Sequence, residues 1–222
     1  MNNLTHPADK ALFDAAPTLI KPSYGDDLPL LALGRKRYIN ASDGLYLQTN
    51  TNTLNASICI AHAQSQLPYG ELSEEIILSH GLIPASILST VIDRSLDVSP
   101  KEWAGIIIFS EKSGYQLLEP ELIKSEIGLV QYKLPEFDGD MVVDIHSHGT
   151  IPAYFSNQDD TDERLTGGVH FSMVVGSCGK EKVEISARLS IDGTFKQLKK
   201  LPFCESLTTL DRYIITGNKN EK

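Results

Sequence analysis

The chain of 222 residues has little cysteine, few aromatic residues and no long hydrophobic run. Its three cysteines, Cys59, Cys178 and Cys204, are far apart and form no CxxC pair. A sparse, odd-numbered set of cysteines argues against a disulfide framework and against a cysteine-rich zinc site. No apolar segment approaches the roughly 20 residues that cross a membrane, and residues 1–10 contain no apolar signal core. We therefore expect a soluble, cytoplasmic protein.

Basic residues are also scarce. The chain has 20 Lys and Arg against 29 Asp and Glu, which gives a formal net charge of −9. A protein that binds nucleic acid needs a basic patch to neutralise phosphates, and the one dense basic stretch here is Lys196, Lys199 and Lys200. The composition therefore argues against nucleic acid as a main partner. The hydrophobic fraction of 41% and the length predict a globular protein of one domain, or one domain with an appendage.

Turn-forming residues are frequent in residues 1–70, which we predict to be a β-rich N-terminal extension. Residues 1–44 show no strong helix pattern. Residues 44–48 and 56–61 have the composition of two strands, and the Asn- and Thr-rich segment 50–55 between them is typical of a turn.

Helical and strand patterns alternate from Glu71 onward. Apolar residues recur at helical spacing between 72 and 77 and again between 87 and 96. Residues 103–109 form a continuous apolar run that is typical of a buried strand, and further strand patterns follow. This order predicts an α/β fold.

We expect residues 71–200 to form one domain, with a central mixed β-sheet flanked by helices. Residues 201–222 are assigned to a C-terminal tail. We expect its end, from Gly217, to be frayed.

Two histidines lie close together at the end of a predicted strand. His146 and His148 are two positions apart, and side chains at i and i+2 share one face of a strand. Asp159 follows after a loop long enough to fold back, and two imidazoles with one carboxylate are a common ligand set in catalytic zinc sites. The segment therefore indicates a metal site. Ser156 and Asp159 also have the spacing of a helix capping box, which is compatible with that role.

A water molecule activated by a metal ion needs a general base. The sequence offers Glu102, directly before the predicted buried strand. A Glu at this place is commonly a plain surface residue, and there are three alternatives, Glu71, Glu74 and Glu75. The residues by themselves leave the choice open.

Five of these positions together resemble the signature of the JAMM metalloproteases, also called the MPN+ or Mov34/PAD-1 family. That signature is a Glu on an early strand after a long helix, then His-x-His, seven residues, Ser, two residues and Asp. The positions that match it in order and spacing are Glu102, His146, His148, Ser156 and Asp159. The resemblance covers residues 83–190 and implies a JAB/MPN domain with a fold similar to that of cytidine deaminase.

The resemblance also implies a role for each matching residue. His146, His148 and Asp159 would bind Zn²⁺. Glu102 would hold and deprotonate a zinc-bound water, and Ser156 would donate a hydrogen bond to the developing oxyanion. The reaction would be hydrolysis of an amide or isopeptide bond, with a ubiquitin-like protein or its conjugate as the substrate.

A closer resemblance is to the PRTRC protein A family. Gly149 stands where many JAMM proteins have Pro, an acidic cluster follows at 159–163, and Tyr24-Gly25 and Pro68-Tyr69-Gly70 lie in the first third of the chain. Members of that family belong to a bacterial, often plasmid-borne gene set with an E1-like ThiF-family protein and a small ubiquitin-like protein. The resemblance implies these two as partners.

Several residues near the motif have more than one interpretation. Trp103 follows the candidate base and could narrow the site, but we expect it in the core. Asp144 shares a strand face with His146 and could orient an imidazole. We interpret His170 as structural. An acidic helix face could contact the metal or the substrate, but we expect it to be solvated; it comprises Asp160, Asp162 and Glu163.

Two other functions are open at this point. The chain could be a non-catalytic MPN-type scaffold in a ubiquitin-like protein system, although such domains usually lose a metal ligand. It could also be a nucleobase deaminase on a similar fold, but that class requires H-x-E and P-C-x-x-C, and neither motif is present. We therefore expect a zinc metallopeptidase.

Overall fold

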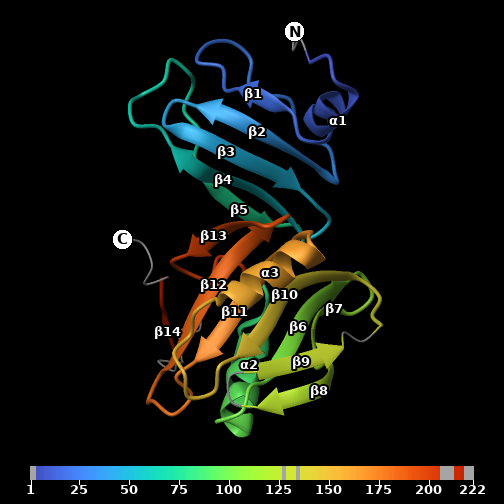
Figure 1. Ribbon diagram of the computed structural model, residues 1–222, viewed down its shortest axis with the longest axis vertical. Coiled ribbons are helices and arrows are strands. Elements are labelled where there is room, and N and C mark those ends of the chain that lie inside the picture. Colours follow the sequence, from blue (N-terminus) through green and yellow to red (C-terminus); the bar gives the residue numbers. More distant parts are fainter. Residues whose placement is uncertain (1–3, 127–128, 134–135, 206–212, 218–222) are drawn as a thin grey trace. The chain divides into compact units, whose positions relative to one another are not determined.

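The computed structural model describes residues 4–126, 129–133, 136–205 and 213–217 (Figure 1). The chain divides into two compact units, Met1–Gly81 and Leu82–Lys222. The described part is a mixed α/β structure with two mixed sheets, a separate two-stranded hairpin and three helices. None of the helices in this part is long and apolar enough to cross a membrane. All three cysteines are buried and free.

The first unit is a five-stranded sheet with one helix. The strand order is β1-β2-β3-β4-β5; β1 and β2 are parallel, and the other neighbours are antiparallel. A small core forms around Ile39, Ala41 and Tyr46. The elements are α1 (Pro7–Ala15), β1 (Thr18–Ile20), β2 (Arg35–Ala41), β3 (Gly44–Asn50), β4 (Leu54–His62) and β5 (Glu75–Leu78).

The predicted hairpin of this unit is confirmed by β3 and β4. The helix predicted between 72 and 77 is wrong, because residues 75–78 form β5 and pair with β4. Ile76 and Ile77 are β-branched and suit a strand, and this segment pairs with β4 and does not form a helix. Helix α1 was not predicted; it starts with Pro7 at its first position, and Ala8 N donates a hydrogen bond to His6 Nδ1 (3.2 Å).

The second unit has a seven-stranded sheet, which is mixed as predicted. Six strands follow the order β13-β12-β11-β10-β6-β7, and β14 pairs with β12. β10 is parallel to β11 and antiparallel to β6, so it lies in the middle of the sheet. The strands are β6 (Ala104–Ser110), β7 (Gly114–Leu118), β10 (Asp140–Ser147), β11 (Val169–Gly176), β12 (Val183–Ile191), β13 (Thr194–Leu198) and β14 (Tyr213–Ile215).

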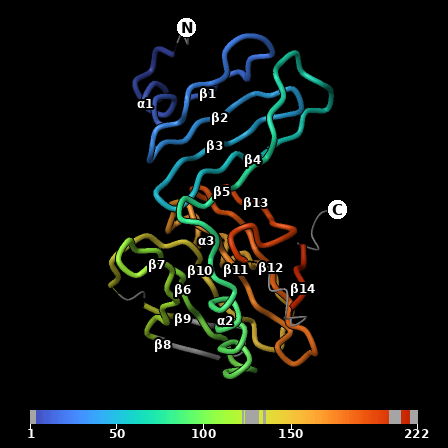
Figure 2. The backbone as a smooth tube through the Cα atoms, turned by 180° about the vertical axis from the view of Figure 1, so that it is seen from behind, coloured from blue at the N-terminus to red at the C-terminus, as the bar shows by residue number. Residues whose placement is uncertain are grey.

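Two helices cover opposite faces of this sheet, α2 (Ala85–Val98) on one and α3 (Asn157–Thr166) on the other (Figures 1 and 2). α2 buries Leu88, Val91 and Ile92. α3 buries a single residue, Glu163. The hairpin of β8 (Glu121–Glu126) and β9 (Leu129–Lys133) forms the separate two-stranded sheet.

The segment after residue 200 contributes to this unit. Glu205 N donates to the carbonyl of Ile83 (3.0 Å), and β14 extends the sheet beside β12. The fraying that we predicted from Gly217 lies, beyond Gly217 itself, outside the described residues.

Candidate metal centre

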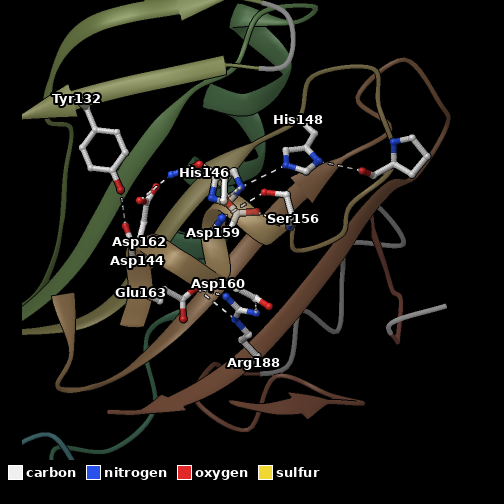
Figure 3. A network of polar contacts seen from close by, with 12 residues as sticks. Tyr132, Asp144, His146, His148, Ser156, Asp159, Asp160, Asp162, Glu163 and Arg188 are labelled. Carbon is white, nitrogen blue, oxygen red and sulfur yellow. Dashed lines mark hydrogen bonds and ion pairs between the residues drawn. The ribbon is translucent and has the colours of Figure 1, made fainter. Parts of the chain in front are cut away.

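His146 and His148 stand at the carboxyl end of β10 and face each other. Their Nε2 atoms are 3.2 Å apart (Figure 3). The backbone N–H of His148 donates to the carbonyl of Val175 (2.7 Å), which continues the pairing of β10 with β11 past the end of the strand. The central strand of the sheet therefore fixes both imidazoles, and strand alternation places them on one face as predicted.

Asp159 reaches the same point from the first turn of α3. Ser156 is the N-cap: its Oγ accepts a hydrogen bond from Asp159 N (3.2 Å), and Asp159 Oδ2 accepts one from Ser156 N (2.6 Å). The expected capping box is therefore present. The other carboxylate oxygen, Oδ1, lies 3.6 Å from His146 Nε2. The Asp159 carboxylate therefore caps the start of α3 with Oδ2 and faces the histidines with Oδ1.

These three side chains have the spacing that a metal ion requires. One ligand atom from each of His146, His148 and Asp159 lies within 4.8 Å of the others. Tetrahedral ligands about 2.0–2.1 Å from a zinc ion are about 3.3–3.4 Å from each other. The two distances of 3.2 and 3.6 Å lie close to that value. The group can therefore bind a metal ion.

His148 is held in the protonation state that a metal ligand needs. Its Nδ1 lies 3.1 Å from the carbonyl oxygen of Pro152. A carbonyl only accepts, so Nδ1 carries the proton and Nε2 keeps its lone pair. Burial lowers the pKa of both imidazoles, that of His146 to about 4. Both rings are therefore neutral near pH 7 and need not lose a proton to bind a metal.

Gly149 lets the loop after His148 pass close to the segment before β6. Its φ is +54°, and a Cβ atom at this position would lie 2.3 Å from the carbonyl oxygen of Pro100. Proline fixes φ near −65°, so a proline at this position could not adopt this conformation.

Glu102 reaches the same cavity from the β6 side. The antiparallel register of β6 and β10 sets Ala104 opposite His146. Ser147 continues this pairing, because its N–H donates to Trp103 O (2.7 Å) and its Oγ accepts from Trp103 N (2.8 Å). One further step in the same register places Glu102 opposite His148. The cavity lined by the three possible ligands is also lined by Glu102.

Glu102 is a buried carboxyl group and not the surface residue that its position suggested. It is 5% exposed. Burial raises its pKa to about 7, and the negative charge of Asp159 adds to the effect. A group that titrates near neutrality suits a general base. The three alternatives, which belong to the first unit, do not line this cavity; they are Glu71, Glu74 and Glu75.

Arg188 of β12 fixes α3 to the sheet. Its guanidinium donates to Asp160 Oδ1 and to Glu163 Oε1 (2.7 Å) (Figure 3). The guanidinium also lies 3.9 Å from the ring centroids of both Phe155 and Phe195. Arg188 is 4% exposed and Glu163 is 7% exposed. The solvated acidic face that we expected is therefore wrong for Glu163, which lies inside.

Tyr132 of β9 brings the β8–β9 hairpin to the site. Its hydroxyl donates to Asp144 Oδ1 (2.9 Å). Burial raises the pKa of Asp144 to about 6, although the hydrogen bond from Tyr132 opposes the shift. Three residues at the site were not predicted, because none belongs to a spacing pattern: Tyr132, Arg188 and Ser147. Trp103 is a core residue, as expected, and its ring covers Gly105.

Each of the two units matches a known protein family. Residues 84–190 match the family of prokaryotic homologs of the JAB domain, and residues 6–79 match a domain of unknown function, DUF2016. No curated protein matches the chain. Among solved structures, the solution structure of protein DSY2949 from Desulfitobacterium hafniense is similar at 10% identity and a TM-score of 0.37, over 60% of this chain and 90% of that chain.

The match to the prokaryotic family spans α2, the central strands of the sheet and α3. It also contains Glu102, Ser156 and the group of His146, His148 and Asp159 that can bind a metal. Residues 84–190 are therefore a JAB-like domain of the JAB/MPN family.

Proposed function

We propose that the chain is a zinc-dependent peptidase or isopeptidase that hydrolyses an amide bond and so processes or removes a ubiquitin-like protein. The observation that carries this proposal is one cavity that holds the His146, His148 and Asp159 group together with the buried carboxyl of Glu102. A buried carboxyl group that lines the same cavity as three possible metal ligands supports a catalytic role over that of a scaffold.

The ligands and the base have separate tasks. His146, His148 and Asp159 would hold Zn²⁺. When bound, this ion polarises the scissile carbonyl group and lowers the pKa of water to about 7. Glu102 accepts a proton from the attacking water and passes it to the leaving amine. A C–O bond forms, the C–N bond breaks, and the products are a carboxylate and an amine.

Ser156 would stabilise the negative charge that develops on the carbonyl oxygen. Its Oγ accepts the hydrogen bond from Asp159 N, and its own proton stays available to donate. Because Ser156 is the N-cap of α3, the same local structure orients a ligand and a hydrogen-bond donor.

The substrate and the partners are proposed from the family resemblance. We propose a ubiquitin-like protein or its conjugate as substrate and an E1-like ThiF-family protein as a further partner, in a bacterial system of the PRTRC type. We also propose a cytoplasmic location and a cytidine-deaminase-like arrangement. A mixed sheet with α2 and α3 on opposite faces supports that arrangement.

The first experiment measures the metal content of the purified chain by mass spectrometry. We expect about one zinc ion per wild-type chain, and none in a double variant with His146→Ala and His148→Ala. The exposed His80 provides a control, since His80→Ala should retain the metal. A wild-type chain without metal, even after zinc is supplied, would overturn the metal site.

The second experiment measures hydrolysis of ubiquitin-like proteins that carry a C-terminal aminomethylcoumarin amide. Glu102→Gln should retain zinc and lose at least about 100-fold in rate, because it cannot accept the proton. Metal-loaded wild type that is no faster than Glu102→Gln on every substrate would support the non-catalytic scaffold instead.

A further inference from the structure

The segment that carries Ser156 and Asp159 contains no buried residue. None of the side chains from Tyr154 to Asp160 is buried, and the first buried residue of α3 is Glu163. Burial of apolar side chains normally fixes a helix against the sheet beside it. This segment therefore depends on another contact to keep a hydroxyl donor and a candidate metal ligand in place.

The capping box fixes only the internal shape of the segment. Its two hydrogen bonds join Ser156 and Asp159 to each other, and the backbone N–H of Asp160 donates to Ser156 O (3.1 Å). All three bonds begin and end within the segment. They form the first turn of α3, but they do not set its position relative to the two histidines at the end of β10.

Arg188 supplies the contact with the sheet, on both sides of the cap. Its Nη1 donates to Asp160 Oδ1, and Asp160 directly follows Asp159 (Figure 3). The guanidinium lies 3.9 Å from the ring centroid of Phe155, which directly precedes Ser156. Within the described part of the chain, the other hydrogen bonds, ion pairs and ring contacts of residues 154–160 go to α3 itself or to the two histidines.

Arg188 is itself held rigidly. It is 4% exposed, and its Nε and Nη2 both donate to Glu163 Oε1 (3.2 and 2.7 Å). The register sets it beside Ser172 of β11, and Ser172 lies beside Asp144 of β10, two residues before His146. A planar guanidinium holds its partners at fixed angles, which a single ammonium group does not. The sheet therefore fixes the position of Arg188 relative to the histidines.

We propose that Arg188 is a positioning residue of the metal centre, which holds the first turn of α3 so that Asp159 and Ser156 are in place before a metal ion or a substrate binds. Arg188 is absent from the described lining of the cavity, so it acts through these two residues. The effect on metal affinity requires only the metal site, whereas an effect on the reaction through Ser156 rests on the proposed function.

The first test follows amide hydrogen exchange by NMR in the metal-free full chain. The hydrogen-bonded amides of Ser156 and Asp159 report on the first turn of α3, and those of β10 and β11 report on the whole domain. In Asp160→Ala, which removes the acceptor for Arg188, exchange at Ser156 and Asp159 should be at least about tenfold faster, and exchange in β10 and β11 should stay within about threefold of wild type.

The second test measures zinc affinity by competition with a chelator, which requires no turnover. Asp160→Ala should bind zinc at least about tenfold more weakly than wild type, as the loss of a group that orients a ligand does in other metal sites.

Asp162→Ala is the matched control for both tests. It removes the same charge from the same helix, but Asp162 accepts a hydrogen bond from Gln158 and has none from Arg188. Asp162 lines the cavity and Asp160 does not, so a purely electrostatic effect on the ion would be larger in the control. We expect the control to change zinc affinity by at most about threefold, because exposed charges interact weakly.

A double variant with Arg188→Met and Glu163→Gln tests Arg188 directly. Removing both members of a buried ion pair is often neutral for stability, so the domain should stay folded while the contact with Asp160 is lost. This variant should also bind zinc at least about tenfold more weakly. If it does not fold, Asp160→Ala carries the test, because the Asp160 side chain is 30% exposed and its loss leaves the buried pair intact.

Equal zinc affinity of Asp160→Ala and Asp162→Ala would overturn the positioning role. Equally faster exchange at Ser156, Asp159 and the strands would do the same, because Arg188 would then act only through global stability. A chain that hydrolyses its substrate and gives either result keeps the proposed function and loses the positioning role. A chain that shows the expected exchange and zinc affinities but hydrolyses nothing keeps the positioning role and loses the peptidase activity.

Discussion

Single side chains around the candidate metal centre serve more than one purpose. Asp159 closes the cap of α3 with Oδ2 and faces His146 with Oδ1. Ser147, placed between the two histidines, turns to the other face and binds the backbone of Trp103. The spacing of the motif therefore combines candidate metal ligands with the local structure that orients them.

Replacing Gly149 by Ala should destabilise the protein more than its positive φ alone explains. We expect a loss of about 1–2 kcal/mol in unfolding free energy from the left-handed conformation. The clash with Pro100 O should add about 2 kcal/mol, as overpacking does elsewhere. Urea unfolding measures both. The control is Gly114→Ala, where φ is +68° and nothing lies within 4 Å of a new Cβ. Equal losses in the two variants would show that the loop yields to the clash.

Two substitutions of Ser156 should separate the helix cap from the chemistry. Ser156→Ala should lower the unfolding free energy by about 1 kcal/mol, and Ser156→Gly by only about 0.3 kcal/mol, because glycine is tolerated as an N-cap. Both variants lack the hydroxyl, so both should retain zinc and lose about 100-fold in rate. Thermal melts and the coumarin assay test this. A fully active glycine variant would remove Ser156 from the mechanism.

Among the elements, α3 is held to the sheet in an unusual way. Its one buried residue is Glu163, and its partner on the sheet is the buried Arg188. A helix normally docks through an apolar stripe. Here a buried ion pair, with Phe155 and Phe195 on the guanidinium, replaces that stripe.

Removing one partner of the Arg188–Glu163 pair should lower the unfolding free energy strongly. Removing both charges together should lower it much less. Arg188→Met leaves Glu163 buried without its partner, and we expect a loss of about 3 kcal/mol in unfolding free energy. The double variant with Arg188→Met and Glu163→Gln should recover most of it. Arg164→Met is the control, since Arg164 is exposed and its pair with Asp160 is worth less than about 1 kcal/mol. A double variant as unstable as Arg188→Met would contradict this account.

The sequence predicted those elements whose pattern is local. The apolar run 103–109 lies in β6 apart from its first residue, and the fixed spacing of the motif drew attention to the group that can hold a metal ion. The segment with Ile76 and Ile77 fits both a helix and a strand, and only the edge of β4 distinguishes them. Arg188 was missed because its partner Glu163 is 25 residues away, and no local pattern records such a distance.

For the molecule as a whole, the two units differ in what is known of their function. The candidate metal centre and its cavity lie within the second unit, and the first unit matches a domain of unknown function.

Stability in acid is a further property of the whole chain, and the buried His170 of β11 contributes to it.

Because of His170, the unfolding free energy of the protein should decrease as the pH falls below about 6.5. Burial lowers the pKa of His170 to about 4, and Arg188 adds to the shift. Between these two pH values the unfolded chain binds a proton that the folded chain does not. The unfolding free energy should therefore fall by about 1.4 kcal/mol per pH unit, or about 3 kcal/mol in all. Above pH 6.5 this contribution is constant.

The measurement compares urea unfolding of metal-free wild type and His170→Gln at pH 7, 5.5 and 4. Glu102 and Asp144, whose pKa values burial raises, act in the opposite sense in both proteins and cancel in the difference. The stability of wild type relative to His170→Gln should decline toward pH 4. A difference that does not change with pH would show that His170 has the same pKa in the folded and the unfolded protein.

The cap at the start of α3 also bears on how fast a metal ion is exchanged. Asp159 separates from the histidines when the first turn of α3 opens, and this turn contributes no apolar residue to the core. Opening it therefore requires far less free energy than unfolding the domain. The residence time of the ion should follow the lifetime of one helical turn, so that metal release becomes a local event in a protein that is otherwise intact.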